Sequence, residues 1–212
     1  MSVTMKNRNA DPSGPEGQER PVNVDADGRV SVNPGLDGDL YKLFVPAGAV
    51  GAGKTFFDLF NATTDKNLEV VSVTPIVDGS VAVTGVLAVN LFLTRTTAVG
   101  TGGTAATAEG TVLTAATISK LDPASPNLPT GVTARLGPGG GATGGAVLGF
   151  NSMFSEETNA ASYNRNNIVS VAPEGLGTRV VVPPSSGIRV VQGAIASVGN
   201  IGFEVVFSVL RK

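Results

Sequence analysis

The sequence predicts an all-β protein, an antiparallel β-sandwich of jelly-roll type with an extended N-terminal arm. Three observations lead to this prediction. The 212 residues include 28 Gly and 13 Pro, and Val, Thr and Ala dominate the remainder, which is the composition of short strands and turns. β-Branched and aromatic residues recur in short runs bounded by turn residues. No stretch of helical length has a convincing helical pattern.

Residues 1–38 are predicted to form the extended arm. The segment has four prolines, Pro12, Pro15, Pro21 and Pro34, among Gly, Asp, Asn and Ser, with scattered Val and a single Leu. Such a composition cannot bury enough apolar surface to fold by itself. Residues 39–212 then form one β-sandwich domain, which is long enough to enclose a core.

The expected strands follow one another through the sandwich domain. They cover residues 40–46, 55–61, 67–78, 80–96, 111–118, 131–136, 144–155, 167–172, 178–183, 187–197 and 200–210. The last strand has the clearest alternation, with one apolar face made of Ile201, Phe203, Val205, Phe207 and Val209. A similar alternation runs from Val81 to Leu93, and its length predicts a bent or twice-used strand.

Two glycine-rich stretches interrupt these strands, at residues 98–110 and 136–146. Glycine permits positive φ and close approach of backbones. We therefore expect long loops there, or places where another chain packs tightly.

Composition also bounds the function. Charged residues are 15% of the chain and the formal net charge is −2, so no strong field would attract nucleic acid or an anionic membrane. The chain has no His and no Cys, which removes disulfides, imidazole and thiolate ligands and the commonest general base. Residues 1–20 lack the apolar core of a signal peptide, and no window resembles a membrane span. We expect a soluble, non-enzymatic protein without metal or cofactor.

The segment GAVGAGKT at residues 48–55 matches the phosphate-binding P-loop pattern through Gly48, Gly53, Lys54 and Thr55. That chemistry requires a strand before the loop and a helix after it, because the helix N-terminus helps to bind the phosphates. Here TFFDLFNATTDKN follows, which has the pattern of a β-strand ending in a turn. We interpret the match as chance and the segment as a glycine-rich turn; a P-loop nucleotidase remains the competing interpretation.

Acidic residues give no stronger site. NVDADG at residues 23–28 resembles the start of a calcium loop, but Pro34 occupies the position of the closing Glu. Glu156 and Glu157 are neighbours and would face opposite sides of a strand. Asp58 and Glu204 lie among apolar residues, and we expect both to face water from the outer side of a sheet.

Four stretches of the chain occur in a recognisable order. They are LTRTTAVGTGGTAATA (93–108), LPTGVTARLGPGGGATGGAVL (128–148), FSEETNAAS (154–162) and GIRVVQGAIASVGNIGFEVVFSV (187–209). Together they resemble β-rich virion proteins of tailed bacteriophages, in which a Thr/Gly loop, a GVTAR turn and an apolar C-terminal strand recur in this order. The resemblance covers residues 55–210 and carries no catalytic residue.

The resemblance implies a structural protein on the outer surface of the phage particle, made in the host cytoplasm. We expect a capsid decoration or cement protein that forms a homo-oligomer such as a trimer and binds the major capsid protein or another virion protein. Nucleic acid and membranes are not expected partners. The arm would lie over neighbouring capsid subunits, where many weak contacts add up across a symmetric shell.

Two other functions remain open at this point. The chain could be a tail, collar or fibre component of the same virion, which copy number per particle would distinguish. It could also be a carbohydrate-binding adhesin module, although such sites usually use exposed aromatic residues, and the chain has no Trp and only Tyr41 and Tyr163 as tyrosines.

Overall fold

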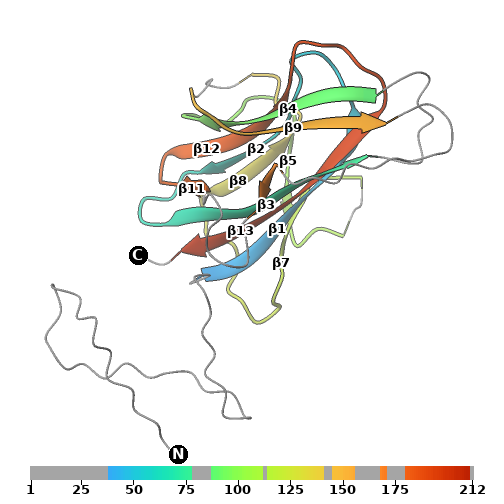
Figure 1. The fold of residues 1–212 in the computed structure, drawn as a ribbon. Helices are drawn as coiled ribbons and strands as arrows, with labels where there is room; N and C mark the ends of the chain where they lie inside the picture. The colour runs from blue at the N-terminus through green and yellow to red at the C-terminus, as the bar shows by residue number, and fades with distance from the viewer. Residues whose placement is uncertain are drawn as a thin grey trace, which may run out of the picture. The chain divides into compact units, whose positions relative to one another are not determined.

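The computed structural model describes residues 38–77, 87–111, 114–140, 145–155, 168–170 and 180–210. Within these residues the chain is all-β, with two sheets and no helix (Figure 1). The predicted β-sandwich is therefore confirmed. The predicted arm lies outside the described residues except for Gly38, where the first strand begins.

The chain crosses repeatedly between the two sheets. The first sheet has the order β10-β3-β13-β1-β7-β6, with β11 also paired to β3. Its strands are β1 (Gly38–Ala49), β3 (Asn67–Val77), β6 (Thr107–Ala108), β7 (Thr117–Lys120), β10 (Val169–Ser170), β11 (Val180–Val182) and β13 (Asn200–Leu210). The second sheet has the order β5-β8-β2-β12-β4-β9. Its strands are β2 (Thr55–Asn61), β4 (Leu87–Thr96), β5 (Thr104–Ala105), β8 (Val132–Leu136), β9 (Val147–Ser155) and β12 (Ser186–Gln192).

The strand pairing is that of a jelly roll. The first strand, β1, pairs with the last, β13, and β2 pairs with β12. Next inward along the chain, β3 pairs with β10 and β11, and β4 pairs with β9. All these pairs are antiparallel, so the chain is a long hairpin folded over into two packed sheets, as in jelly rolls.

The core lies between the sheets because each strand alternates inward and outward side chains. In β13 the five side chains expected to form the apolar face are all buried, at 0–4% exposure: Ile201, Phe203, Val205, Phe207 and Val209. The Phe203 ring lies 5.1 Å from Phe56 and 5.5 Å from Phe57, both on β2 in the opposite sheet. These contacts join the two layers.

An insertion between β4 and β9, residues 97–146, widens both sheets. It supplies β7, which pairs with β1, and β8, which pairs with β2. β1 and β2 would otherwise be edge strands with unpaired backbone groups. The Tyr41 hydroxyl on β1 donates a hydrogen bond of 2.9 Å to the carbonyl of Pro126 in the insertion.

Several strand boundaries differ from the predictions. The strand predicted at 187–197 ends at Gln192, because its side-chain amide donates to the Ile195 carbonyl and turns the following segment into a loop. The strand predicted at 111–118 is observed as β7, and residues 114–116 are not extended. The glycine-rich stretch at 98–110, predicted as loop, contains the two-residue strands β5 and β6. Residues 80–86 of the predicted long strand lie outside the described residues.

Candidate functional site

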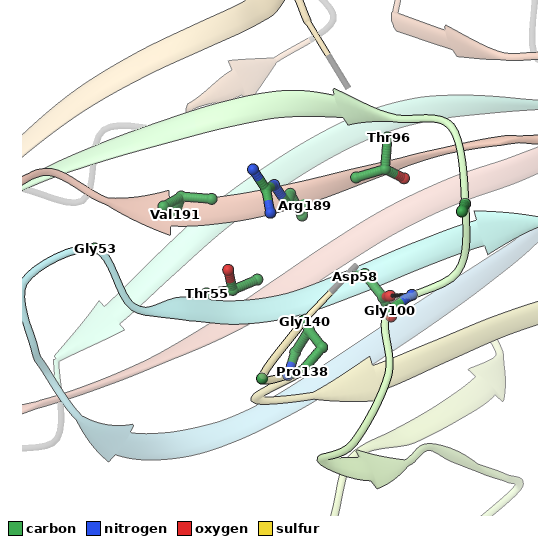
Figure 2. Close-up of a pocket in the computed structure, with 11 residues that line it drawn as sticks. Gly53, Thr55, Asp58, Thr96, Gly100, Pro138, Gly140, Arg189 and Val191 are labelled. Atoms are coloured by element: carbon green, nitrogen blue, oxygen red, sulfur yellow. Dashed lines mark hydrogen bonds between the residues drawn. The ribbon is translucent and has the colours of Figure 1, made fainter. Parts of the chain in front are cut away.

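A pocket of about 340 Å³ lies on the outer face of the second sheet. Strands β2, β4 and β12 form its floor, and loops of the insertion form one wall. Its lining residues are Gly53, Thr55, Asp58, Thr96, Ala98, Gly100, Pro138, Gly139, Gly140, Arg189 and Val191. Figure 2 shows Arg189, Val191 and Thr96 on one side, Pro138 and Gly140 on the other, and Thr55 and Asp58 between them.

The wall of the pocket forms where the two glycine-rich stretches meet. The Thr101 amide donates to the Gly140 carbonyl at 2.7 Å, and the Gly139 amide donates to the Thr101 carbonyl at 3.0 Å. Gly103 has a φ of 64°, and a Cβ atom there would lie 2.3 Å from the Leu136 carbonyl oxygen. Close backbone packing therefore occurs here between two segments of the same chain, whereas the alternative expectation was packing by another chain.

Asp58 is buried beneath this wall. It is 2% exposed, which corrects the expectation that it faces water. It does lie on the outer side of its sheet, but the Gly100 loop and Pro138 cover it. One carboxylate oxygen, Oδ2, accepts a hydrogen bond from the Gly100 amide. The other carboxylate oxygen, Oδ1, is also buried. No group among the described residues lies at both the distance and the angle of a hydrogen bond to it.

The electrostatics of Asp58 follow from this burial. Desolvation raises the pKa of its carboxyl group above the ordinary value, because the charged form is excluded from water. The backbone amides of Gly100 and Arg135 and the positive charges of Arg135 and Arg189 oppose this shift without cancelling it.

Arg189 is the charged side chain that lines the pocket beside Asp58. It lies opposite Asp58 on the neighbouring strand, and its Nε atom donates to Thr94 Oγ1 at 3.2 Å. This bond fixes the guanidinium group on the outer face of β12. No described residue accepts a hydrogen bond from its two terminal nitrogens.

The P-loop match forms the connection between β1 and β2. Strand β2 follows directly at Thr55, where a phosphate-binding loop would be followed by a helix. The backbone amides of the connection are already used: Val50 donates to Gly199, Gly51 to Gln192 Oε1, Gly53 to Gly193 and Lys54 to Gly51. None of these four amides is available to cradle a phosphate.

The residues of the P-loop match also diverge in space. Gly53 and Thr55 line the pocket of about 340 Å³, whereas Gly48 and Lys54 line a separate pocket of about 410 Å³ at the end of the sandwich. Lys54 donates to the Ala49 carbonyl and lies over the Phe56 ring, 5.4 Å from its centroid. Partial burial lowers the pKa of Lys54.

Of the remaining acidic candidates, only Glu204 lies within the described residues. Glu204 lies on the outer side of β13, half-exposed, and pairs with Lys42 at 3.2 Å. Residues 23–28, Pro34, Glu156 and Glu157 lie outside the described residues. In the part of the chain that the structure describes, no group of three or more acidic side chains is placed to hold a metal, and no helix could cross a membrane.

The pocket combines hydroxyl, guanidinium and backbone groups, and this set can bind and orient a polar ligand by hydrogen bonds. Sequence reasoning missed Arg189 and Thr96 as site residues because β12 and β4 meet β2 only in the folded sheet. An acid inside the apolar run FFDLF was the available signal for Asp58. No protein family, curated protein or solved structure matches this chain. The class of the protein is therefore taken from its fold and its pocket alone. It is a jelly-roll protein with a polar pocket on the outer face of the second sheet.

Proposed function

We propose that this chain is a structural protein of a tailed-bacteriophage particle that decorates the outside of the capsid. The observation that carries this proposal is the jelly-roll strand pairing, which runs from the β1–β13 pair to the β4–β9 pair. Jelly rolls form viral capsid domains, and also lectins and cupins. The resemblance of residues 55–210 to phage virion proteins selects the first of these uses.

The connection between arm and sandwich supports attachment through the arm. Residues 1–37 run directly into β1, which pairs with β13 on one side and β7 on the other. Gly38, the first residue of β1, pairs with Leu210, so this strand would fix one end of an extended arm. Its Pro-rich composition suits an extended segment that adds main-chain hydrogen bonds to neighbouring subunits.

The β12–β13 loop offers an apolar contact for such a partner. Ile195 is 68% exposed and Val198 is 46% exposed on this short loop. Two large apolar side chains this close together on a surface favour a protein contact.

Removing residues 1–37 tests the proposal, because β1 begins at Gly38 and the sandwich should stay folded. Full-length and truncated chains are mixed with purified phage particles that lack the protein, and bound copies are counted by cryo-electron microscopy. We expect the full chain to repeat over the icosahedral shell and the truncated chain to be lost, with unchanged thermal unfolding of the sandwich.

Other results would contradict the proposal. Density confined to one vertex would identify a tail or collar component. Truncated protein that still covers the shell would exclude the arm as the attachment element. A full chain that binds no particle would reject the virion function.

A further inference from the structure

A row of side chains crosses the outer face of the second sheet and ends in the pocket. Phe92 of β4 lies opposite Phe150 of β9 on one side and opposite Val191 of β12 on the other. Val191 in turn lies opposite Thr55 of β2. Neighbouring strands lie about 4.8 Å apart, so these four strands give a row on the order of 15 Å long. Because Val191 and Thr55 line the pocket, the row and the pocket form one surface.

The β9 end of this surface is aromatic. Phe150 is 54% exposed, and its ring lies 5.2 Å from the Phe92 ring at an interplanar angle of 47°. Leu91 and Leu93, the neighbours of Phe92, are fully buried on the inner face. The two phenylalanines therefore contribute to the outer surface, and the contact with Phe92 holds the exposed ring in place. An exposed aromatic ring on a rigid sheet is a preformed platform.

Polar groups flank the aromatic pair on both sides. On one side, Ser152 Oγ donates to Asn90 Oδ1 at 2.8 Å, and both residues are exposed. On the other side, Thr94 accepts the bond from Arg189 Nε. The terminal nitrogens of Arg189 are donors of fixed geometry that suit two adjacent acceptor oxygens. The surface thus alternates between apolar and hydrogen-bonding positions.

We propose that this outer face binds an oligosaccharide. A sugar ring has an apolar face of C–H groups and a rim of hydroxyls, so it can cover the Phe150 ring while its hydroxyls reach polar neighbours. Arg189 would donate to hydroxyl oxygens on adjacent ring carbons, and Thr55 would bond to the next sugar unit in the pocket. The length of the row suits a chain of several units rather than a single sugar.

The surface answers the objection raised by the sequence, where aromatic residues for a sugar site were not evident. Tyr41 is only 1% exposed and stacks on Phe207 in the core. Phe150 supplies the exposed ring in its place. Asp58 has a positioning role here: it holds the Gly100 loop against the sheet and lies beside Arg189, while its own oxygens stay beneath the surface.

The test uses the purified full-length chain on an array of immobilised oligosaccharides, both neutral and uronic-acid types. Affinity electrophoresis in gels containing dextran or alginate then gives relative dissociation constants. We expect binding to at least one saccharide. Phe150→Ala should weaken it about tenfold, which corresponds to one well-placed aromatic contact. Arg189→Lys should weaken it also, because the charge remains but the paired donors are lost.

Leu121→Ala is the matched control. Leu121 is 47% exposed and lies directly after β7 of the first sheet. Its substitution therefore removes a similar area of apolar surface away from the proposed site. Thermal unfolding verifies that all variants fold. The inference is overturned if no saccharide on the array or in the gels binds, or if Leu121→Ala weakens binding as much as Phe150→Ala. It is overturned equally if Phe150→Ala abolishes attachment to phage particles without any saccharide binding, since the face would then be a protein interface. The array and gel readouts do not depend on the virion function, so each proposal can fail separately.

Discussion

The jelly-roll frame and the loops of the insertion between β4 and β9 are stabilised by different kinds of interaction. The frame closes around apolar side chains such as Phe203, Phe57 and Leu91, each fully buried. In the described part of the insertion, β7 and β8 bury Ile118, Val132 and Ala134 in the same core, whereas β5 and β6 are two residues each and exposed. The insertion loops outside β7 and β8 are held by a few specific contacts, including the Gly100 amide on Asp58 and the Pro126 carbonyl on Tyr41.

This difference predicts how each region responds to substitution. A core of many apolar contacts spreads its stabilisation over many atoms, so its stability follows the buried volume. Insertion loops held by single hydrogen bonds and close glycine contacts depend on particular atoms at particular positions. We therefore expect substitutions in the frame to destabilise the whole domain, and substitutions in the insertion loops to loosen only those loops.

The largest effect is expected in the frame. Phe203→Ala removes a ring that contacts both Phe56 and Phe57 across the sheets. The free energy of unfolding should fall by about 3–5 kcal/mol, measured by urea denaturation. Leu121→Ala, at an exposed position, should change it by about 0.5 kcal/mol or less. Equal effects of the two variants would mean that Phe203 does not join the layers.

A smaller and local effect is expected from Gly103→Ala, with Gly53→Ala as its control. Both glycines have positive φ, at 64° and 67°, so both alanines incur a backbone cost of about 1–2 kcal/mol. A Cβ on Gly53 meets nothing within 4 Å, whereas one on Gly103 would clash with the Leu136 carbonyl. Gly103→Ala should therefore cost about 1–3 kcal/mol more.

Hydrogen exchange would locate that loss. We expect faster exchange at β5 and β8 in the Gly103→Ala protein, while the β13 amides stay protected. If the two variants behave alike, or if β13 also loses protection, the insertion is not a separate unit of stability.

The smallest effect concerns Asp58→Asn and its dependence on pH. Burial raises the pKa of Asp58 in the folded state, so its contribution to stability is greatest below its unfolded pKa of about 3.9. That contribution is lost as the pH rises through the folded pKa. The stability of wild type relative to Asp58→Asn should therefore decrease as the pH rises from about 3.9 through the folded pKa of Asp58.

This prediction concerns the difference in free energy of unfolding between wild type and Asp58→Asn. The other carboxyl groups are present in both proteins, so their titration cancels in that difference. Asn keeps an oxygen that can accept the Gly100 hydrogen bond. Urea denaturation at each pH gives the difference directly. A difference that grows with pH would show that the charges of Arg135 and Arg189 outweigh the desolvation of Asp58.

The fold was predictable where one physical constraint acts along the chain. A strand covered on one face repeats its apolar residues every second position, and this repeat located β13 and the inward positions Val89, Leu91 and Leu93 of β4. It failed at the end of β12. The Gln192 side chain donates to the nearby Ile195 carbonyl and accepts from the amide of Gly51, which is distant in sequence, and these two bonds end the strand.

The site was less predictable because its parts come from distant segments. The composition around Asp58 shows an acid in an apolar run, but its burial depends on Gly100, 42 positions away. The exposure of Phe150 depends on which side of β9 faces out, and its register with β4 includes a bulge between Leu93 and Thr94. The P-loop pattern shows that a sequence match can occur without a site. Its glycines are present, but their amides form hydrogen bonds within the protein.

The pairing of Gly38 with Leu210 has a consequence for the order in which the molecule can be built. β13 lies between β1 and β3 in the first sheet, yet among the strands of that sheet it is the last to leave the ribosome. Until it does, β1 and β3 cannot be joined, and each has an open edge able to pair with another chain. Contacts so far apart in sequence also form slowly. We therefore expect this sheet to close only after synthesis of Asn200–Leu210, so the nascent chain has a period of exposure to aggregation.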